Sequence, residues 1–316
     1  MNNYWPEGLL LHTAQNRSLT QSAAGLHEAL YSQTVLEGRV SVCTREHDLL
    51  VDFGFCTGRI PRCEGALGVL EGTVRDIALL SRVGKPVCFV VDNILQNPDG
   101  SITPILSRRR AQQLCCDNYI RHLRPGDVIA ARVTHLEAFG CFVDIGCGIC
   151  SMIPIDCISI SRISHPSDRF CTGQDIHAVV TGIDQNLRVS LSHKELLGSW
   201  EQNAAQFCAG ETVSAIIRSV ESYGIFAELT PNLAGLAEVR PGVRAGQQAS
   251  VYIKSLIPEK MKVKLILIDA FDTPSHPQPM QYFIDSGHID HWVYSPVQSP
   301  RKIETFFAPS LSETAE

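Results

Sequence analysis

Short runs in which apolar and polar residues alternate recur along the chain and predict β-strands. The clearest run has Cys141, Val143 and Ile145 at every second position. Because successive side chains of a strand point to opposite faces, these three residues are expected inside a barrel. Phe142 and Asp144 are then expected outside it. Strands this short and this evenly spaced predict a small closed barrel.

A second copy of this pattern follows the first along the chain. An offset of 84 positions relates Gly126 to Gly210, Gly140 to Gly224, Phe142 to Phe226, and Asp144 to Glu228. Chance does not keep one offset through two glycines, an aromatic residue and an acid, so the segment is a duplicated domain. In the second copy the same alternation predicts Ile225, Ala227 and Leu229 inside the barrel, with Phe226 and Glu228 outside.

Each copy ends in a further alternating strand. The residues predicted inside are Val189, Leu191, Val263, Leu265 and Leu267. The residues predicted outside are Arg188, Ser190, Ser192, Lys262 and Lys264. Both closing strands therefore turn cationic side chains toward the solvent.

A weaker copy precedes these two. Residues 35–40 match the opening strand, residues 49–54 the second strand, and residues 106–109 the end of the closing strand. Residues 47–50 read His-Asp-Leu-Leu where the other copies carry an aromatic pair. We expect the barrel to persist in this copy without the aromatic residues.

The remaining segments predict connectors and a C-terminal appendage. Apolar residues at helical spacing predict helical connectors within 107–123 and 194–207, and residues 273–279 are a linker by composition. Further on, residues 282–284 and 291–294 are candidate strands of a small appendage. The predicted domains are an N-terminal helical extension (1–34), a divergent barrel (35–112), two further barrels (122–198 and 205–271), and a proline-containing linker with an acidic C-terminal tail (272–316).

Composition narrows the classes of protein. An apolar fraction of 44% with 19% charged residues is typical of a globular chain. No apolar run reaches the roughly 18 residues that span a bilayer, and the amino terminus lacks a secretory pattern, which predicts a cytoplasmic protein away from membranes. The 12 cysteines should then stay thiols. Because the net charge is −6, any affinity for nucleic acid must rest on local cations and on stacking.

The middle copy carries a more specific set of motifs. It has Phe-Gly-Cys-Phe-Val-Asp-Ile-Gly at 139–146, His-Pro-Ser at 165–167, and Asp-Gln-Asn-Leu-Arg-Val-Ser-Leu-Ser at 184–192. These resemble the S1 RNA-binding motif, an OB fold, of the ribosomal protein S1 family. The later copy is similar but lacks the His-Pro-Ser loop. The first copy is similar to the amino-terminal modules of that family, and the resemblance spans about residues 35–270.

The resemblance implies roles for particular residues. In the family, two aromatic residues stack on bases and a cation on the closing strand contacts RNA. The matching positions are Phe139, Phe142, Arg188, Tyr223, Phe226 and Lys262. We add Lys264, which also faces outward beside the rings, and His165 of the His-Pro-Ser loop. Two departures are Pro154 and Glu238, which stand where the family has a histidine.

Each of these residues also has a structural interpretation. The rings would otherwise belong to the core or to a protein interface, the cations to a solvated strand face, and His165 to the bracing of its own loop. His193 and Lys194 are expected to be exposed at a helix start and peripheral to the site. His288 and His291 are assigned to a surface loop.

A zinc or redox centre is disfavoured. Cys147 and Cys150 form a CxxC motif, with Cys157 and Cys171 further on. The pair leaves a strand rather than opening a helix, and a second CxxC motif, which would make a zinc site specific, does not follow it.

The sequence therefore predicts a mainly β protein of three tandem OB barrels joined by short helices, with a small C-terminal appendage. The predicted function is non-catalytic binding of single-stranded RNA such as mRNA, by stacking and local Arg and Lys contacts. The first barrel is expected to dock on the small ribosomal subunit, and the protein to be a monomer without cofactor or metal. The alternatives are a protein adaptor in RNA decay or transcription and, less favoured, an enzyme built on Cys147 and Cys150.

Overall fold

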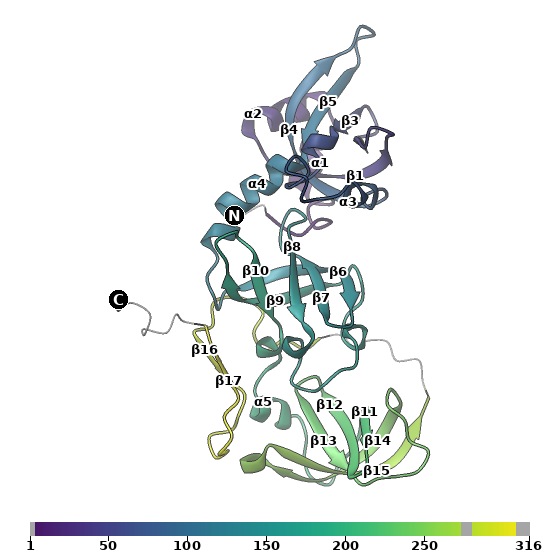
Figure 1. Ribbon diagram of the computed structural model, residues 1–316, viewed down its shortest axis with the longest axis vertical. Helices are drawn as coiled ribbons and strands as arrows, with labels where there is room; N and C mark the ends of the chain where they lie inside the picture. Colours follow the sequence, from purple (N-terminus) through teal and green to yellow (C-terminus); the bar gives the residue numbers. More distant parts are fainter. Residues whose placement is uncertain (1–3, 273–279, 308–316) are drawn as a thin grey trace, which may run out of the picture. The chain divides into compact units, whose positions relative to one another are not determined.

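The computed structural model describes residues 4–272 and 280–307. These residues form three closed five-stranded barrels (Figure 1). In each barrel the strands, numbered from its own first strand, neighbour one another in the order one, two, three, five, four. The predicted fold class, a mainly β chain of three OB-like barrels, is confirmed. Among the described residues no helix is both long enough and apolar enough to cross a bilayer.

The strands lie within the three predicted barrel domains, whose exact boundaries stay a prediction. The first barrel comprises β1 (Leu36–Cys43), β2 (Leu49–Asp52), β3 (Thr57–Ile60), β4 (Pro86–Gln96) and β5 (Ile102–Ser107). The second comprises β6 (Val128–Glu137), β7 (Gly140–Asp144), β8 (Cys150–Pro154), β9 (Asp175–Ile183) and β10 (Val189–Ser192). The third comprises β11 (Thr212–Glu221), β12 (Gly224–Thr230), β13 (Leu233–Ala237), β14 (Gln248–Ile257) and β15 (Lys262–Phe271).

Helices flank and connect the barrels. The N-terminal segment holds α1 (Ala14–Thr20) and α2 (Ala23–Ser32), whose first turns are capped by Thr13 and Ser22. A short α3 (Ile77–Leu80) lies inside the first barrel's sequence. Both predicted connectors are helical, with α4 (Arg108–Asn118) and a 3₁₀ turn at Ile120–His122 in one, and a 3₁₀ turn at Lys194–Leu197 followed by α5 (Trp200–Ala204) in the other.

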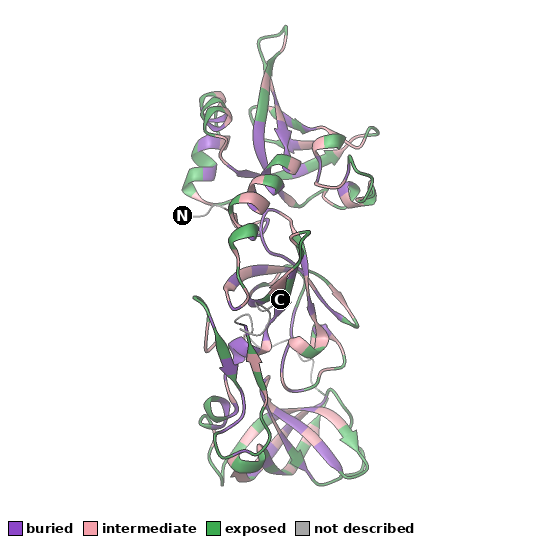
Figure 2. Cartoon of the chain, turned by 60° about the vertical axis from the view of Figure 1, so that its left-hand side comes forward, coloured by how far each residue is buried: buried purple, intermediate pink, exposed green. Residues whose placement is uncertain are grey.

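The barrel interiors follow the predicted alternation (Figure 2). The residues predicted inside are buried, except that Leu229 and Leu267 are half-buried. The glycine between the two aromatic positions is required by packing in both copies. A Cβ on Gly140 would lie 2.6 Å from the carbonyl oxygen of Ile153, and one on Gly224 would lie 2.8 Å from that of Ala237. The next strand therefore approaches too closely for any side chain there.

Asp144 and Glu228 lie outside their barrels, as predicted, but both are buried. Both point away from their barrel's interior, yet only 4% and 5% of their surfaces are exposed. Asp144 accepts hydrogen bonds from the backbone N–H groups of Glu7 at 2.7 Å, Gly146 at 2.8 Å and Gly148 at 3.0 Å. Burial, and then the nearby Glu7 carboxylate, raise the pKa of Asp144 to about 7. The outer face of the strand is here covered by another segment of the chain.

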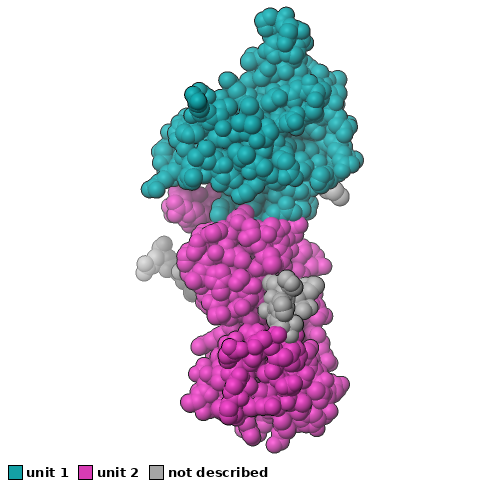
Figure 3. Space-filling model, turned by 90° about the vertical axis from the view of Figure 1, so that its right-hand side faces the viewer, with its two compact units in different colours: residues 1–123, 130–132, 144–150 teal, residues 124–129, 133–143, 151–316 magenta. Residues whose placement is uncertain are grey.

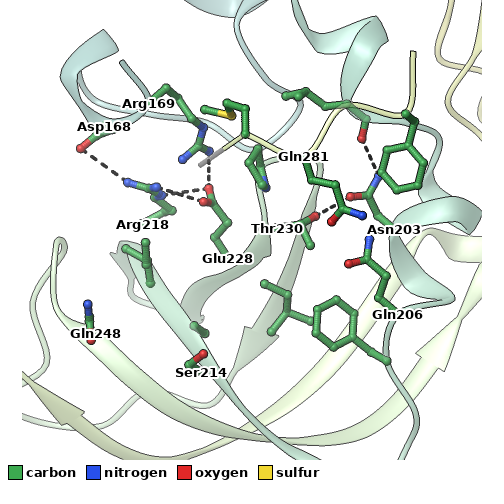
Figure 4. Close-up of a pocket in the computed structure, with 18 of the residues that line it drawn as sticks. Asp168, Arg169, Asn203, Gln206, Ser214, Arg218, Glu228, Thr230, Gln248 and Gln281 are labelled. Carbon is green, nitrogen blue, oxygen red and sulfur yellow. Dashed lines mark hydrogen bonds and ion pairs between the residues drawn. The ribbon is translucent and has the colours of Figure 1, made fainter. Parts of the chain in front are cut away.

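Glu228 is covered by arginines instead. The Arg169 guanidinium donates to its Oε2 at 2.5 Å, and Arg218 donates to both carboxylate oxygens at 2.9 Å. Figure 4 shows both guanidinium groups directed at Glu228, on one side of a pocket of about 480 Å³. Arg169 belongs to the loop that follows β8, whereas Glu228 lies on β12. This ion cluster therefore joins the second barrel to the third.

Ser192 also lies on the outer face of its strand, as predicted, but it is buried. Its hydroxyl donates to the Glu195 carboxylate at 2.5 Å. The 3₁₀ turn that follows β10 thus folds back over the outer face of that strand.

The segment 280–307 packs on the barrels. Strands β16 (His291–Val293) and β17 (Glu304–Phe306) pair antiparallel, whereas the candidate strand at 282–284 is not a strand. Trp292 and Tyr294 are buried in the apolar cluster that includes the third barrel's interior. The Tyr294 hydroxyl donates to the carbonyl of Asn232 at 2.5 Å. The predicted linker at 273–279 and the end of the predicted acidic tail, 308–316, lie outside the described residues.

The chain divides into two compact units (Figure 3). One comprises residues 1–123, 130–132 and 144–150, and the other comprises residues 124–129, 133–143 and 151–316. The second unit holds both copies of the aromatic pair and the C-terminal segment.

Candidate nucleic-acid interface

The second barrel presents a pair of rings at the hairpin between β6 and β7. Phe139 is 57% exposed and Phe142 is half-buried. Their ring centroids lie 5.9 Å apart, with the planes at 89°. Neither ring belongs to the barrel's interior, so the core interpretation does not hold for this pair.

The third barrel repeats this geometry. Tyr223 is 69% exposed and Phe226 is half-buried. Their centroids lie 6.1 Å apart at 87°. Since Gly140 and Gly224 shape both hairpins alike, the duplication has preserved a particular edge-to-face arrangement that leaves flat apolar surface accessible to a ligand.

The strand register places a cation in the same row as one ring of the third barrel's aromatic pair. Phe226 pairs with Leu236 on β13, and Leu236 pairs with Lys264 on β15. These three side chains therefore form one row across the outer face. Lys262 lies two positions earlier on the same face of β15, and both lysines are exposed. In the second barrel, Arg188 is exposed just before β10.

The row borders a hollow of about 890 Å³ in the third barrel. The polar and aromatic side chains around it are Tyr223, Phe226, Glu238, Arg240, Lys254, Lys262 and Lys264. Lys254 and Arg240 were missed by the sequence analysis. A signal for Lys254 was present, because it alternates with the buried Val251 and Ile253 of β14. Arg240 instead stands in the loop after β13, where no periodicity points to it.

His135 is a third missed residue, and it lies in the second barrel. Its ring lies 6.4 Å from that of Phe142 with the planes at 31°, and its Nε2 lies 2.7 Å from the Glu137 carboxylate. The His135 side chain is 65% exposed. The second barrel thus shows three adjacent rings at its surface.

His165 braces its own loop. Its Nδ1 accepts a hydrogen bond from the backbone N–H of Ser167 at 3.1 Å, and the Asp168 carboxylate accepts one from the backbone N–H of His165. This is a capping box at the start of the 3₁₀ turn Pro166–Asp168. The bracing interpretation therefore holds, and a contact between His165 and RNA stays a prediction.

The expectation that His193 and Lys194 are exposed is wrong. Lys194 is half-buried, and its Nζ donates to the carbonyl of Asp156 at 3.3 Å. His193 is fully buried; its Nδ1 lies 2.9 Å from the carbonyl of Ile158, and its Nε2 lies 3.1 Å from the Tyr282 hydroxyl. Burial lowers the pKa of His193 to about 4. Tyr282 covers this position from 89 residues away, which no local pattern reveals.

The candidate metal or redox residues are Cys147, Cys150, His288 and His291. Cys147 is buried with a positive φ of 50°, whereas Cys150 is exposed. In residues 4–272 and 280–307, no group of three or more His, Cys, Asp or Glu side chains is arranged to hold a metal. His288 bonds Asp127 at 2.6 Å, and His291 stacks on Phe306 at 4.0 Å.

Comparison with known proteins agrees with this geometry. The model of the S1 RNA binding domain matches residues 122–194. Small ribosomal subunit protein bS1 of Rhizobium meliloti is 28% identical over 225 residues, which cover 65% of this chain and 39% of that protein. Its counterpart in Staphylococcus aureus strain COL is 26% identical over 262 residues, covering 78% and 64%.

The resemblance to the ribosomal protein S1 family, inferred from the motifs of the second barrel, is confirmed. The chain spans less than two thirds of the length of these bS1 relatives. Among solved structures, a multidomain protein with nucleic acid binding domains from Streptococcus pneumoniae is 14% identical with a TM-score of 0.24. That match covers 75% of this chain and 73% of the other.

Proposed function

We propose that this chain binds single-stranded RNA without catalysing a reaction, through the ring pairs of its second and third barrels. The observation that carries the proposal is the repeated pair, Phe139 with Phe142 and Tyr223 with Phe226, in one geometry. An exposed ring stacks on any base, with about 1–3 kcal/mol per base, so little sequence preference is expected.

Cations beside the rings supply the second contribution. We assign to Arg188, Lys262 and Lys264 contacts with phosphates or base faces next to the stacked bases. His165, at the edge of the second barrel's loop, is retained as a proposed RNA contact. The two platforms are the ring pairs, Phe139 with Phe142 and Tyr223 with Phe226, together with the cations assigned to each. Both platforms belong to one compact unit. An RNA strand bound at one platform therefore has a raised effective concentration at the other.

The relatives suggest where this binding takes place. The bS1 proteins carry the name of the small ribosomal subunit, and we propose that this chain meets mRNA on that subunit in the cytoplasm, as a monomer and without a cofactor. The first barrel lacks the ring pair; His47 takes its place with a positive φ of 65° and lies 3.4 Å from Asp76. The first barrel is therefore assigned to docking on the ribosomal subunit rather than to stacking on RNA bases.

The decisive experiment measures affinity for an unstructured oligouridylate. Replacing both Phe142 and Phe226 by alanine is expected to weaken binding at least about tenfold, because 1.4 kcal/mol corresponds to that factor and two rings are lost. Tyr31→Ala is the matched control, since Tyr31 is 85% exposed on α2 and belongs to the other compact unit. If the double variant binds as tightly as the wild type, stacking is not how the protein works.

Co-sedimentation with small ribosomal subunits tests the docking assignment. The full chain is expected to co-sediment, and the Phe142→Ala, Phe226→Ala double variant should still do so because the first barrel is unchanged. Loss of co-sedimentation in that variant would show that RNA held by the platforms, rather than the first barrel, mediates the association.

A protein adaptor remains the second candidate function. The observation that favours it is apolar surface on the third barrel beyond the lysines, where Val239, Ile266 and Ile268 are 52%, 46% and 50% exposed. Weak RNA binding together with tight capture of a protein through these residues would favour this reading.

A further inference from the structure

The two platforms differ in charge although each carries an aromatic pair of the same geometry. Around the third barrel's hollow, Lys254 comes from β14, and Lys262 and Lys264 come from β15. All three lysines are exposed. Arg240 also borders the hollow and donates to the carbonyl of Ile268 at 2.7 Å, and Glu238 is the acid that borders it.

The corresponding positions of the second barrel can be assigned from backbone contacts. The N–H of Gly126 donates to the carbonyl of Val180, and the N–H of Gly210 donates to that of Ile253. The next residues, Thr181 and Lys254, are therefore equivalent.

The closing strands correspond in the same way. Ser190 pairs with Met152 across a parallel register, as Lys264 pairs with Leu236. Two of the third barrel's three lysines are thus Thr181 and Ser190 in the second barrel, and only the Arg188 position keeps a cation.

The second barrel has a ring where the third has none. At the offset of 84 positions, His135 corresponds to Ser219, which pairs with Phe226 across the β11–β12 register. A small hydroxyl thus replaces an imidazole beside the aromatic pair. In the second barrel, Glu137 lies beside His135, and the Asp184 carboxylate accepts a hydrogen bond from the backbone N–H of Arg188.

We propose that the two platforms take different parts of one RNA strand: the second barrel holds bases on Phe139, Phe142 and His135, and the third barrel holds phosphates with Lys254, Lys262 and Lys264. This inference rests on the proposed function and adds His135 and Lys254 to the RNA contacts. It follows from the chemistry of the groups, because a stacked ring displaces no counterions whereas each neutralised phosphate releases them.

Salt dependence separates the two contributions. Each phosphate contact on a single strand contributes about −0.7 to the slope of log affinity against log salt. Replacing all three lysines by glutamine is therefore expected to make the slope for an oligouridylate shallower by about 2. Replacing Phe139, Phe142 and His135 by alanine is expected to lower affinity at every salt concentration without changing the slope.

Two controls define the lysine and histidine effects. Lys260→Gln removes an exposed lysine that does not border the hollow, and it should leave the slope unchanged. His135→Ala alone should weaken binding, and His135→Phe should restore it, because the proposed role needs a ring rather than a charge. A double variant, Lys262→Gln with Lys264→Gln, should change the slope by about two thirds as much as the triple variant, since slopes scale with the number of contacts.

The inference is overturned if the lysine triple variant keeps the wild-type slope, or if the ring triple variant changes the slope as much as the lysine variant does. It is also overturned for His135 if His135→Phe binds as weakly as His135→Ala. The proposed function fails separately, if the Phe142→Ala, Phe226→Ala double variant binds like the wild type.

Discussion

The second and third barrels are copies of one template, yet each buries the acidic residue at the equivalent position by different contacts. Asp144 is held by three backbone N–H groups, those of Glu7, Gly146 and Gly148. Glu228 is held by the guanidinium groups of Arg169 and Arg218. A residue that points out of a barrel is therefore not thereby exposed to solvent. Each copy has used its outward acid to fasten a different segment of the chain.

The largest effect in this comparison is expected for Glu228→Ala. It leaves two arginines, with 3% and 10% of their side-chain surfaces exposed, without their shared carboxylate. Breaking a buried ion pair by removing one partner costs about 3–5 kcal/mol, measured as the free energy of unfolding in urea. Asp272→Ala is the control, because its pair with Arg244 is 69% and 71% exposed and should contribute less than about 1 kcal/mol. Equal losses in the two variants would mean that the arginine cluster adds nothing beyond a surface pair.

Asp144→Ala is expected to cost less, about 1–3 kcal/mol near neutral pH. It removes the acceptor of buried N–H groups, but the wild-type carboxylate is itself disfavoured in its charged form by burial. The result would break the comparison if Asp144→Ala destabilised the protein more than Glu228→Ala does.

The pH dependence of the same variant sharpens the contrast. The pKa of Asp144 is raised from its ordinary 3.8 to about 7, so the folded state retains a proton that the unfolded state has lost. Its contribution to stability is full below pH 3.8 and falls as pH rises toward 7. The stability of the wild type relative to Asp144→Ala should therefore decrease between those values, in urea unfolding at several pH values. A difference that stays constant would contradict the raised pKa.

A smaller effect of opposite sign is expected at His193, where the third barrel has Leu267. Burial lowers the pKa of His193 from 6.5 to about 4, so the unfolded state binds a proton first as pH falls. Its contribution is full above pH 6.5 and is lost toward pH 4, by about 1.4 kcal/mol per pH unit at most. The stability of the wild type relative to His193→Gln should shrink over this range. An unchanged difference would indicate that the pKa of His193 is the same in the folded and unfolded protein, which would contradict its lowered pKa.

Local pattern was sufficient for the interior and for the exposed rings. The period of two along β7 and β12 correctly separates Cys141 and Val143 from Phe142, and Ile225 and Ala227 from Phe226. The repeat offset then predicts that both ring pairs share one arrangement. These features depend on neighbours within one hairpin, which are close in sequence.

The residues whose burial the sequence pattern did not reveal have a different cause in common. Asp144 meets Glu7 across 137 positions, Glu228 meets Arg169 across 59, and His193 meets Tyr282 across 89. Periodicity states on which side of a strand a residue lies but not which distant segment covers that side. Lys254 was missed for a related reason, since β14, which carries it, reaches the hollow beside the rings only in the closed barrel. His135 lies on β6 in the same hairpin as Phe142, so its proximity to that ring could have been inferred locally.

The sequence by itself determined the duplicated β template, the residues that fill each barrel and the rings displayed at each hairpin, because alternation and a constant offset are properties of the chain alone. Only the tertiary structure decided which outward side chains stay in water, which become buried anchors, and which cations gather around Tyr223 and Phe226. Those outcomes depend on contacts between residues far apart in the chain. Burial in such a contact changes the free energy of a charged side chain by several kcal/mol, on the order of its desolvation penalty.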